Sequence, residues 1–174
     1  MTKRVYNFTW DLIGNIEEGR PTLGNETRLE VYRLFQFTIR DILEQKLGSK
    51  EEVDKIFFEA GKLAGRLFVE KFVGKQKSLY EFLSLVQKKL EEFKIGILRV
   101  EDVAEKNMRL LLSVEEDLDC SGLPDLDMET CHYDEGFLKG ILEYQLECDY
   151  SVKEIDCWCL GDRTCRFEAK QTEN

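Results

Sequence analysis

The sequence predicts an α+β fold in which a helical N-terminal half packs on an antiparallel sheet. Apolar residues repeat at spacings of three and four up to about residue 93, and they alternate with period two over most of the remainder. Helices that come first and strands that come later are typical of this class. The chain has 174 residues, two prolines and no linker-like stretch or repeat, so we expect residues 1–174 to form one domain.

The N-terminal segment is expected to contain a strand and then the first helix. Residues 5–13 alternate roughly as a strand does. Residues 26–47 carry apolar side chains at helical spacing, with Asn25 placed to cap the helix and Gly48 placed to end it.

Two capping boxes predict the next two helices. Ser49 and Ser78 are each followed three residues later by a glutamate, which indicates helices that run to about residues 73 and 93. Gly61 and Gly65 lie four residues apart in the first of these helices and therefore share one face. That face is expected to let another backbone come close.

The second half is expected to supply the sheet, with one helix between its two pairs of strands. The predicted order is a hairpin of residues 95–103 and 107–116, a polar loop 117–130, a helix 134–147, and closing strands 150–160 and 163–169.

The charge balance disfavours two classes of partner. The chain has 25 basic and 35 acidic residues, a net charge of −10, which repels phosphate backbones and anionic lipid. No apolar run has the 18 or so residues of a membrane span, and the start has no apolar signal-peptide region. We therefore expect a cytoplasmic protein that binds neither nucleic acid nor membrane.

The cysteines predict a metal site. All six lie in the last third of a chain that is large enough to fold without disulfide bridges. Clustered thiols in a reducing compartment favour metal binding, and the alternative is that several are buried apolar residues. They are Cys120, Cys131, Cys148, Cys157, Cys159 and Cys165.

The closing strands suggest how two thiols meet. A three-residue loop at 160–162 would make Cys157 and Cys165 cross-strand neighbours, close enough to share one ion. A two-residue turn would instead place Trp158 opposite Cys165. Cys131 precedes a helix, where exposed N–H groups favour a thiolate, and is a plausible third ligand.

Spacing leaves the fourth ligand open. Cys159 lies on the same strand face as Cys157, whereas Glu154 lies on the opposite face of a regular strand. Glu154 reaches the site only through a bulge or a strand end.

Two C-terminal segments resemble the 4-vinyl reductase domain family. They are CHYDEGFLKGILEYQLE (131–147) and VKEIDCWCLGDRTCRFE (152–168), and the helical segments 23–48 and 59–72 are also similar to that family. The resemblance implies the α+β fold shared by haem-based nitric-oxide sensors and a vesicle-tethering subunit. The family includes stand-alone prokaryotic proteins, sensory domains of aromatic-responsive transcription activators, and an accessory protein of bacteriochlorophyll synthesis.

The resemblance also implies a ligand set. In the sensors a structural zinc is held by one cysteine, one glutamate and two further cysteines, which match Cys131, Glu154, Cys157 and Cys165 here. This set implies a local irregularity between Glu154 and Cys157. The sensors bind aromatic effectors beside the zinc and dimerise, so the resemblance implies a hydrophobic ligand and a homodimer.

The leading hypothesis is a domain that binds a hydrophobic or aromatic small molecule and contains a structural Zn²⁺. Aromatic side chains of the helical half could wall a cavity or simply pack in the core; they are Phe35, Phe57, Phe58, Phe68, Phe72, Tyr80 and Phe82.

Two alternatives remain: a reductase or accessory protein for vinyl-group reduction in tetrapyrrole metabolism, and a ligand-free dimeric scaffold. Catalysis is not favoured, because the sequence has no dinucleotide or flavin motif and a four-ligand zinc leaves no open position, so no catalytic residue is assigned. His132 is interpreted as a helix-start residue. Cys120, Cys148 and Cys159 are placed outside the site, with a Cys120–Cys148 disulfide as an alternative.

Overall fold

The computed structural model describes residues 6–104, 108–126 and 130–172. The chain divides into two compact units, residues 1–38 and 39–174. The expectation of one domain over residues 1–174 stays a prediction. No helix in the described ranges is long and apolar enough to cross a membrane.

The expected strand near the N-terminus is wrong for the described residues of that segment. The structure has a 3₁₀ helix, η1 (Trp10–Ile13), followed by a short helix, α1 (Ile16–Gly19). The N–H of Gly14 donates to the Asp11 carbonyl, and the Asn15 side chain accepts from the N–H of Glu18. These local hydrogen bonds take the place of strand pairing.

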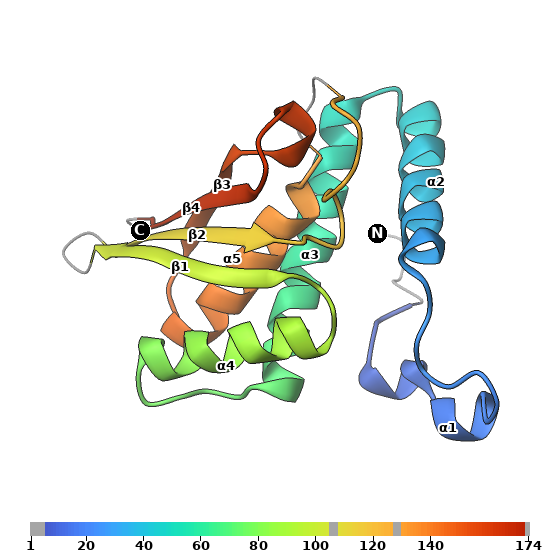
Figure 1. Ribbon diagram of the computed structural model, residues 1–174, viewed down its shortest axis with the longest axis horizontal. Coiled ribbons are helices and arrows are strands. Elements are labelled where there is room, and N and C mark those ends of the chain that lie inside the picture. The colour runs from blue at the N-terminus through green and yellow to red at the C-terminus, as the bar shows by residue number, and fades with distance from the viewer. Residues whose placement is uncertain (1–5, 105–107, 127–129, 173–174) are drawn as a thin grey trace. The chain divides into compact units, whose positions relative to one another are not determined.

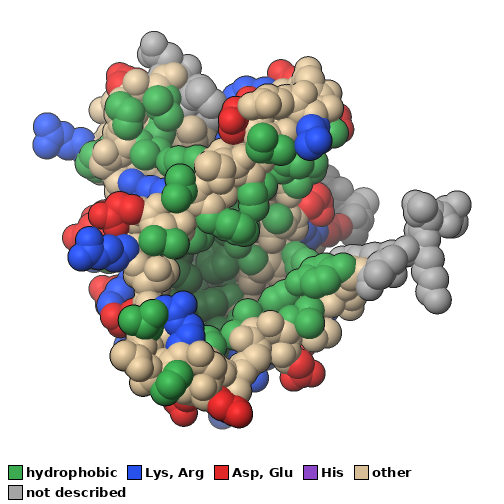
Figure 2. Space-filling view, turned by 90° about the vertical axis from the view of Figure 1, so that its right-hand side faces the viewer, with side chains coloured by type: hydrophobic (Ala, Val, Ile, Leu, Met, Phe, Trp, Pro, Cys, Tyr) green, Lys and Arg blue, Asp and Glu red, His purple; other side chains and the backbone are tan. Residues whose placement is uncertain are grey.

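The three long helices form where the sequence predicts them, except that the first begins at Leu29 rather than at residue 26, so Asn25 does not cap it. They are α2 (Leu29–Leu47), α3 (Lys50–Phe72) and α4 (Leu79–Glu92). The side chain of Ser49 accepts from the N–H of Glu52 at 3.2 Å, and Ser78 accepts from Glu81 at the same distance. None of the residues of α2 is buried. Figure 2 shows hydrophobic side chains exposed on one face of the molecule.

The described strands make one antiparallel sheet in the order β1-β2-β4-β3. Both predicted strand pairs are present, and β4 joins them by pairing with β2 as well as with β3. The helix α5 lies behind the sheet, beside α3 (Figure 1). The α+β class is therefore confirmed. The bounds are β1 (Ile97–Ala104), β2 (Arg109–Glu115), α5 (His132–Leu146), β3 (Tyr150–Asp156) and β4 (Cys165–Gln171).

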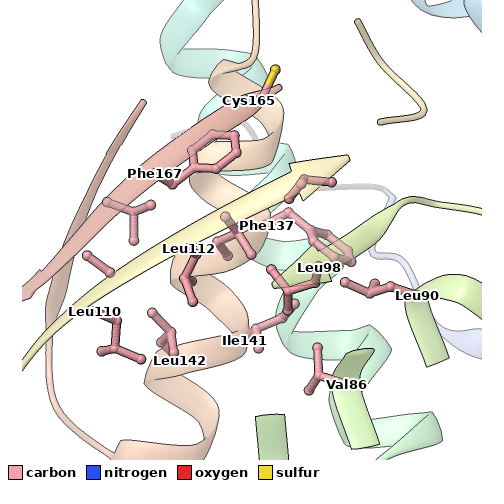
Figure 3. Close-up of a cluster of buried hydrophobic side chains, with 14 of the residues drawn as sticks. Val86, Leu90, Leu98, Leu110, Leu112, Phe137, Ile141, Leu142, Cys165 and Phe167 are labelled. Atoms are coloured by element: carbon pink, nitrogen blue, oxygen red, sulfur yellow. The ribbon is translucent and has the colours of Figure 1, made fainter. Parts of the chain in front are cut away.

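The hydrophobic core lies between the sheet, α4 and α5. In Figure 3, Leu110 and Leu112 of β2 point toward Ile141 and Leu142 of α5, while Cys165 lies at one end of the cluster. The four aliphatic side chains are no more than 1% exposed. Burial of each such side chain stabilises the fold by roughly 1.5–3 kcal/mol.

Glycines let α3 and α5 come into backbone contact. A Cβ added to Gly61 or Gly65 would lie 2.0 Å from a carbonyl oxygen of α5, which confirms the expected close approach. The helix α5 contributes its own pair, Gly136 and Gly140, where a Cβ would lie 2.0 and 2.1 Å from carbonyl oxygens of α3. This contact fixes α5, and with it Cys131, against α3.

Candidate metal centre

A bulge near the end of β3 brings Glu154 and Cys157 to one side of the sheet. Glu154 pairs with Phe167 and Asp156 pairs with Arg166, so the register shifts by one residue between them. In a regular strand, the side chains of residues 154 and 157 lie on opposite faces of the sheet. The extra residue of the bulge moves residue 157 to the face that carries residue 154. The irregularity implied by the family resemblance is thus present.

The turn between β3 and β4 differs from both turns considered in the sequence analysis. The strand β3 ends at Asp156, and the chain forms a 3₁₀ helix, η3 (Trp158–Leu160), before Gly161 takes a φ of 97°. The side chain of Asp162 accepts a hydrogen bond from the N–H of Cys157 at 3.0 Å. Because this local bonding ends the ladder early, Cys157 and Cys165 flank a longer loop instead of pairing across a tight hairpin.

Cys131 lies at the N-cap of α5, which begins at His132, two residues earlier than predicted. Its carbonyl accepts the N–H of Glu135 at 3.0 Å, and its thiol points to the end of the ribbon formed by β3 and β4. The helix entrance therefore delivers a third sulfur, as expected.

The structure brings all four predicted ligand residues together. One donor atom from each of Cys131, Glu154, Cys157 and Cys165 lies within 4.8 Å of the other three. The sulfur of Cys131 is 3.8 Å from that of Cys157 and 3.7 Å from that of Cys165. Two bonds of about 2.3 Å at a tetrahedral zinc would separate their sulfurs by about 3.8 Å. The spacing of the thiols therefore fits one tetrahedral ion.

The carboxylate of Glu154 also fits a cation. Both of its oxygens are buried and have no hydrogen-bond partner among the described residues. Burial, together with the negative charges of Cys165 and Cys157, raises the pKa of Glu154 to about 11. A buried carboxyl without donors is stabilised either by a proton or by a metal ion.

The thiols share their hydrogen bonds unequally. Hydrogen bonds from Cys120, Cys131 and Cys165 lower the pKa of Cys157, so its sulfur is the favoured thiolate of the cluster. Hydrogen bonds with Cys120, Cys157 and Cys165 raise the pKa of Cys131, and the one with Cys120 has the largest effect. A stabilised thiolate is a suitable starting point for a metal, whose binding releases protons from its ligands.

Cys120 is not one of the four clustered donor residues, but it lies beside one of them. Its sulfur is 2.9 Å from that of Cys165, and both residues are buried. The Cys120–Cys148 disulfide is also excluded, because both are free thiols and Cys148 lies elsewhere, on a groove lined by α3 and α5. Cys159 is buried against the hydroxyl of Thr130, with 3.2 Å between sulfur and oxygen. The sequence holds no spacing signal that links Cys120 to Cys165, because their contact depends on the path of a loop.

Carboxylates surround the centre. Asp117 and Asp119 are buried, and burial together with the charge of Asp119 raises the pKa of Asp117 to about 7. Burial likewise raises the pKa of Asp134, in the first turn of α5. A cation at the centre would favour the ionised form of these carboxyls and lower their pKa values, so the acidic surroundings are compatible with a bound metal ion.

His132 turns away from the sulfurs and toward α3. Its Nε2 lies 3.3 Å from a carboxylate oxygen of Asp54, and its Nδ1 lies 3.3 Å from Glu135. Glu135 is 2% exposed and accepts the N–H of Glu154 at 2.9 Å. This buried carboxylate, which the sequence analysis did not single out, ties α5 to the strand that carries Glu154.

A groove of about 430 Å³ lies beside this network, between α3, α5 and β3. Only one of the aromatic residues considered for a cavity wall, Phe58, lines it. Phe68 and Phe72 pack instead against Phe93 and Phe137, with ring centroids 4.6–5.8 Å apart. Residues lining the groove include Phe58, His132, Glu135, Lys139, Tyr150 and Lys153.

The fold and these donors define an α+β domain with a three-cysteine, one-glutamate cluster that could hold a metal ion. Residues 110–171 match the model of the V4R domain family, which confirms the resemblance seen in the sequence. An uncharacterized protein of Methanocaldococcus jannaschii is 29% identical over 97% of this chain and 89% of its own length. A second uncharacterized protein of that organism is 28% identical over 87% of this chain and 83% of its own length.

Solved structures share the fold at low sequence identity. A vinyl-4-reductase family protein from M. jannaschii is 18% identical with a TM-score of 0.58, and the alignment covers 86% of this chain and 85% of that one. The phenol-responsive sensory domain of the transcription activator PoxR, with phenol, is 16% identical with a TM-score of 0.59, covering 77% and 71%.

The fold type named in the sequence analysis is also confirmed. A trafficking protein particle complex subunit 3 from Naegleria fowleri has a TM-score of 0.59 at 14% identity, covering 81% of this chain and 95% of that one. An H-NOX protein from S. oneidensis has a TM-score of 0.52 at 14% identity, covering 79% and 74%.

Proposed function

We propose that this protein is a small-molecule sensor domain in which a structural Zn²⁺ joins the ribbon of β3 and β4 to the start of α5. The ligands would be Cys131, Glu154, Cys157 and Cys165. The observation that carries the proposal is the approach of their four donor atoms to within 4.8 Å, with sulfur separations of tetrahedral size.

The donor set favours a structural ion. Four protein donors fill a tetrahedral shell and leave no position for a substrate. When bound, Zn²⁺ would neutralise the buried thiolates and the Glu154 carboxylate. Structural zinc contributes about 10–16 kcal/mol of apparent binding energy in zinc-finger peptides, and less where a core already exists.

Elemental analysis of the purified protein tests the metal. We expect about one zinc per chain, retained through dialysis against a weak chelator. A chain that is folded, reduced and free of metal after refolding with added zinc would contradict the proposal.

The ligand is proposed to be a hydrophobic or aromatic small molecule. Support comes from the V4R match and from the likeness to a sensory domain solved with phenol. The groove beside the centre is lined by Phe58 together with His132 and Lys139, a mixture of aromatic and polar groups typical of small-molecule sites.

A thermal-shift screen with phenols and tetrapyrroles tests the ligand. A true ligand raises the melting temperature by mass action, by an amount that grows with its concentration over Kd. Phe58→Ala should abolish the shift, whereas Tyr80→Ala, at a side chain that is 83% exposed, should leave it unchanged. No shift with either class of compound would count against a sensor.

Self-association is a second proposal, carried by α2. Leu34 and Phe35 are each 66% exposed on a helix that has no buried residue, and apolar patches of this kind mark interfaces. We expect a homodimer by sedimentation and a monomer for the Leu34→Glu, Phe35→Glu double variant.

Vinyl-group reduction stays a hypothesis that turnover with a supplied reductant would establish.

A further inference from the structure

The sulfur of Cys120 is a fifth potential donor at the proposed metal centre. It lies 2.9 Å from the sulfur of Cys165, and Cys120 is completely buried. The cluster therefore holds four thiols and one carboxylate, one donor more than a tetrahedral ion uses.

The loop that carries Cys120 is held to the centre by hydrogen bonds. The Asp117 side chain accepts the N–H of Cys120 at 3.0 Å, and the Cys120 carbonyl accepts the N–H of Leu123 at 3.0 Å. The carbonyl of Leu123 in turn accepts the indole N–H of Trp158, which belongs to η3 between two of the proposed ligands. Cys120 is therefore positioned by the same structure that positions Cys157.

The distance between Cys120 and Cys165 distinguishes this pair from the others. At 2.9 Å it is longer than a disulfide bond, about 2.05 Å, and shorter than the separations of 3.7 and 3.8 Å to Cys131. Two sulfurs on one tetrahedral ion lie about 3.8 Å apart, so the pair would need to separate by only about 0.9 Å to share an ion.

We propose that Cys120 is an alternative fourth ligand that sets which metals the centre accepts. This inference rests on the metal centre proposed above. The sulfurs of Cys131, Cys157 and Cys165 form a common face. Zn²⁺, a borderline ion, completes its shell with the oxygen of Glu154. Cd²⁺, a softer ion, completes it with the sulfur of Cys120, because softer ions favour sulfur over oxygen donors.

Competition titrations with Zn²⁺ and Cd²⁺ test this division. Cys120→Ser should weaken Cd²⁺ binding by more than about 10–100-fold, the range for loss of an outer-shell partner of a metal ligand, and leave Zn²⁺ nearly unchanged. Glu154→Gln should do the reverse. Cys148→Ser removes a thiol remote from the centre and should bind both ions as the unchanged chain does.

Two titration results would overturn the proposal. In the first, the Cys120→Ser variant binds Cd²⁺ as tightly as the Cys148→Ser variant does. In the second, the Cys120→Ser variant loses affinity for both ions equally. Failure of the unchanged chain to bind either ion would overturn the metal centre as well. The role of Cys120 alone would be overturned if only Glu154→Gln weakened zinc binding and Cys120→Ser left Cd²⁺ binding unchanged.

X-ray absorption on the unchanged chain gives a second test that does not require a variant to fold. We expect three sulfurs and one oxygen around Zn²⁺ and four sulfurs around Cd²⁺. An oxygen in the Cd²⁺ shell, with three sulfurs, would exclude Cys120 as its ligand.

Discussion

At the scale of single residues, hydrogen bonds of the backbone set the orientation of the thiol groups. The N–H of Cys157 donates to Asp162, and the Cys157 carbonyl accepts from Leu160 and Asp162 at 3.0 and 3.2 Å. These bonds hold the Cys157 sulfur at the end of the ribbon, where it faces Cys131 at 3.8 Å. Cys159, two residues on, belongs to η3 and points to Thr130 instead.

Replacing Cys157 should therefore affect the metal more than replacing Cys159 does. Cys157→Ser is expected to lose most bound zinc and to lower the free energy of unfolding by about 4 kcal/mol or more, as loss of a metal does. Cys159→Ser should keep the metal and cost less. Zinc content and denaturant unfolding of both variants check this, and equal loss of zinc would reassign the ligands.

At the scale of elements, the crossing of α3 and α5 positions the first ligand. Gly65 and Gly140 let the two backbones touch, and the start of α5 then brings Cys131 to the end of the sheet. Glu143 of α5 adds an ionic connection: its carboxylate bonds Lys62 of α3 at 2.8 Å, Lys139 at 2.8 Å and the N–H of Tyr150 of β3 at 3.1 Å.

A methyl group at this crossing should force the helices apart. We expect Gly65→Ala to lower the free energy of unfolding by about 1–3 kcal/mol, since its Cβ would meet the carbonyl of Phe137 and overpacking carries such a cost. Gly19→Ala, in open space on α1, should change stability by less than about 1 kcal/mol. Urea unfolding of both variants measures the difference, and equal effects would contradict close packing at Gly65.

The Glu143 contacts should make stability depend on acid. Burial acts to raise the pKa of Glu143, but hydrogen bonds from Lys139 and Lys62 outweigh it, so its pKa lies below the usual 4.5. A carboxyl with a lowered pKa stabilises the fold above its unfolded pKa and loses that contribution as pH falls through its folded pKa. Glu143→Gln should therefore be less stable at pH 7, by a margin that shrinks below about pH 4.5.

Thermal melts of the unchanged chain and Glu143→Gln between pH 3 and pH 7 measure this margin. Glu92→Gln serves as the control, because Glu92 pairs with Lys89 on the surface with 59% of its side chain exposed. A margin that stays constant with pH would mean that the charge of Glu143 does not contribute.

At the scale of the whole molecule, the candidate centre joins the start of α5 to the paired strands β3 and β4, a link that the sheet alone does not make. Cys131 opens α5, Glu154 lies in β3, and Cys165 begins β4. In Figure 3, Val86, Leu90 and Leu98 lie toward the other end of the buried cluster from Cys165. Metal binding should thus stabilise one end of the residue 39–174 unit.

Removal of metal is expected to act unevenly. With a chelator, amide hydrogen exchange should speed up at residues 157–164 and at the start of α5, while α4 stays protected, since local stability follows local contacts. Hydrogen-exchange mass spectrometry with and without zinc checks this. A uniform increase along the chain would show that the ion controls global unfolding instead.

Sequence patterns predicted the long helices and both strand pairs, and the family resemblance supplied the residues of the candidate centre. Ser49 and Ser78 start helices through hydrogen bonds within three residues, and alternation marks strands because neighbouring side chains face opposite ways. The resemblance selected Glu154, which a regular strand would have excluded.

How these parts meet follows from contacts between elements that are far apart in the sequence. The bulge that turns Cys157 toward Glu154 depends on pairing with β4, and the turn after Asp156 depends on the Asp162 side chain. The contact of Cys120 with Cys165 joins residues 45 positions apart, through a loop with no periodic pattern. Periodicity reports which face a residue occupies within its own element, whereas distances between elements arise from packing.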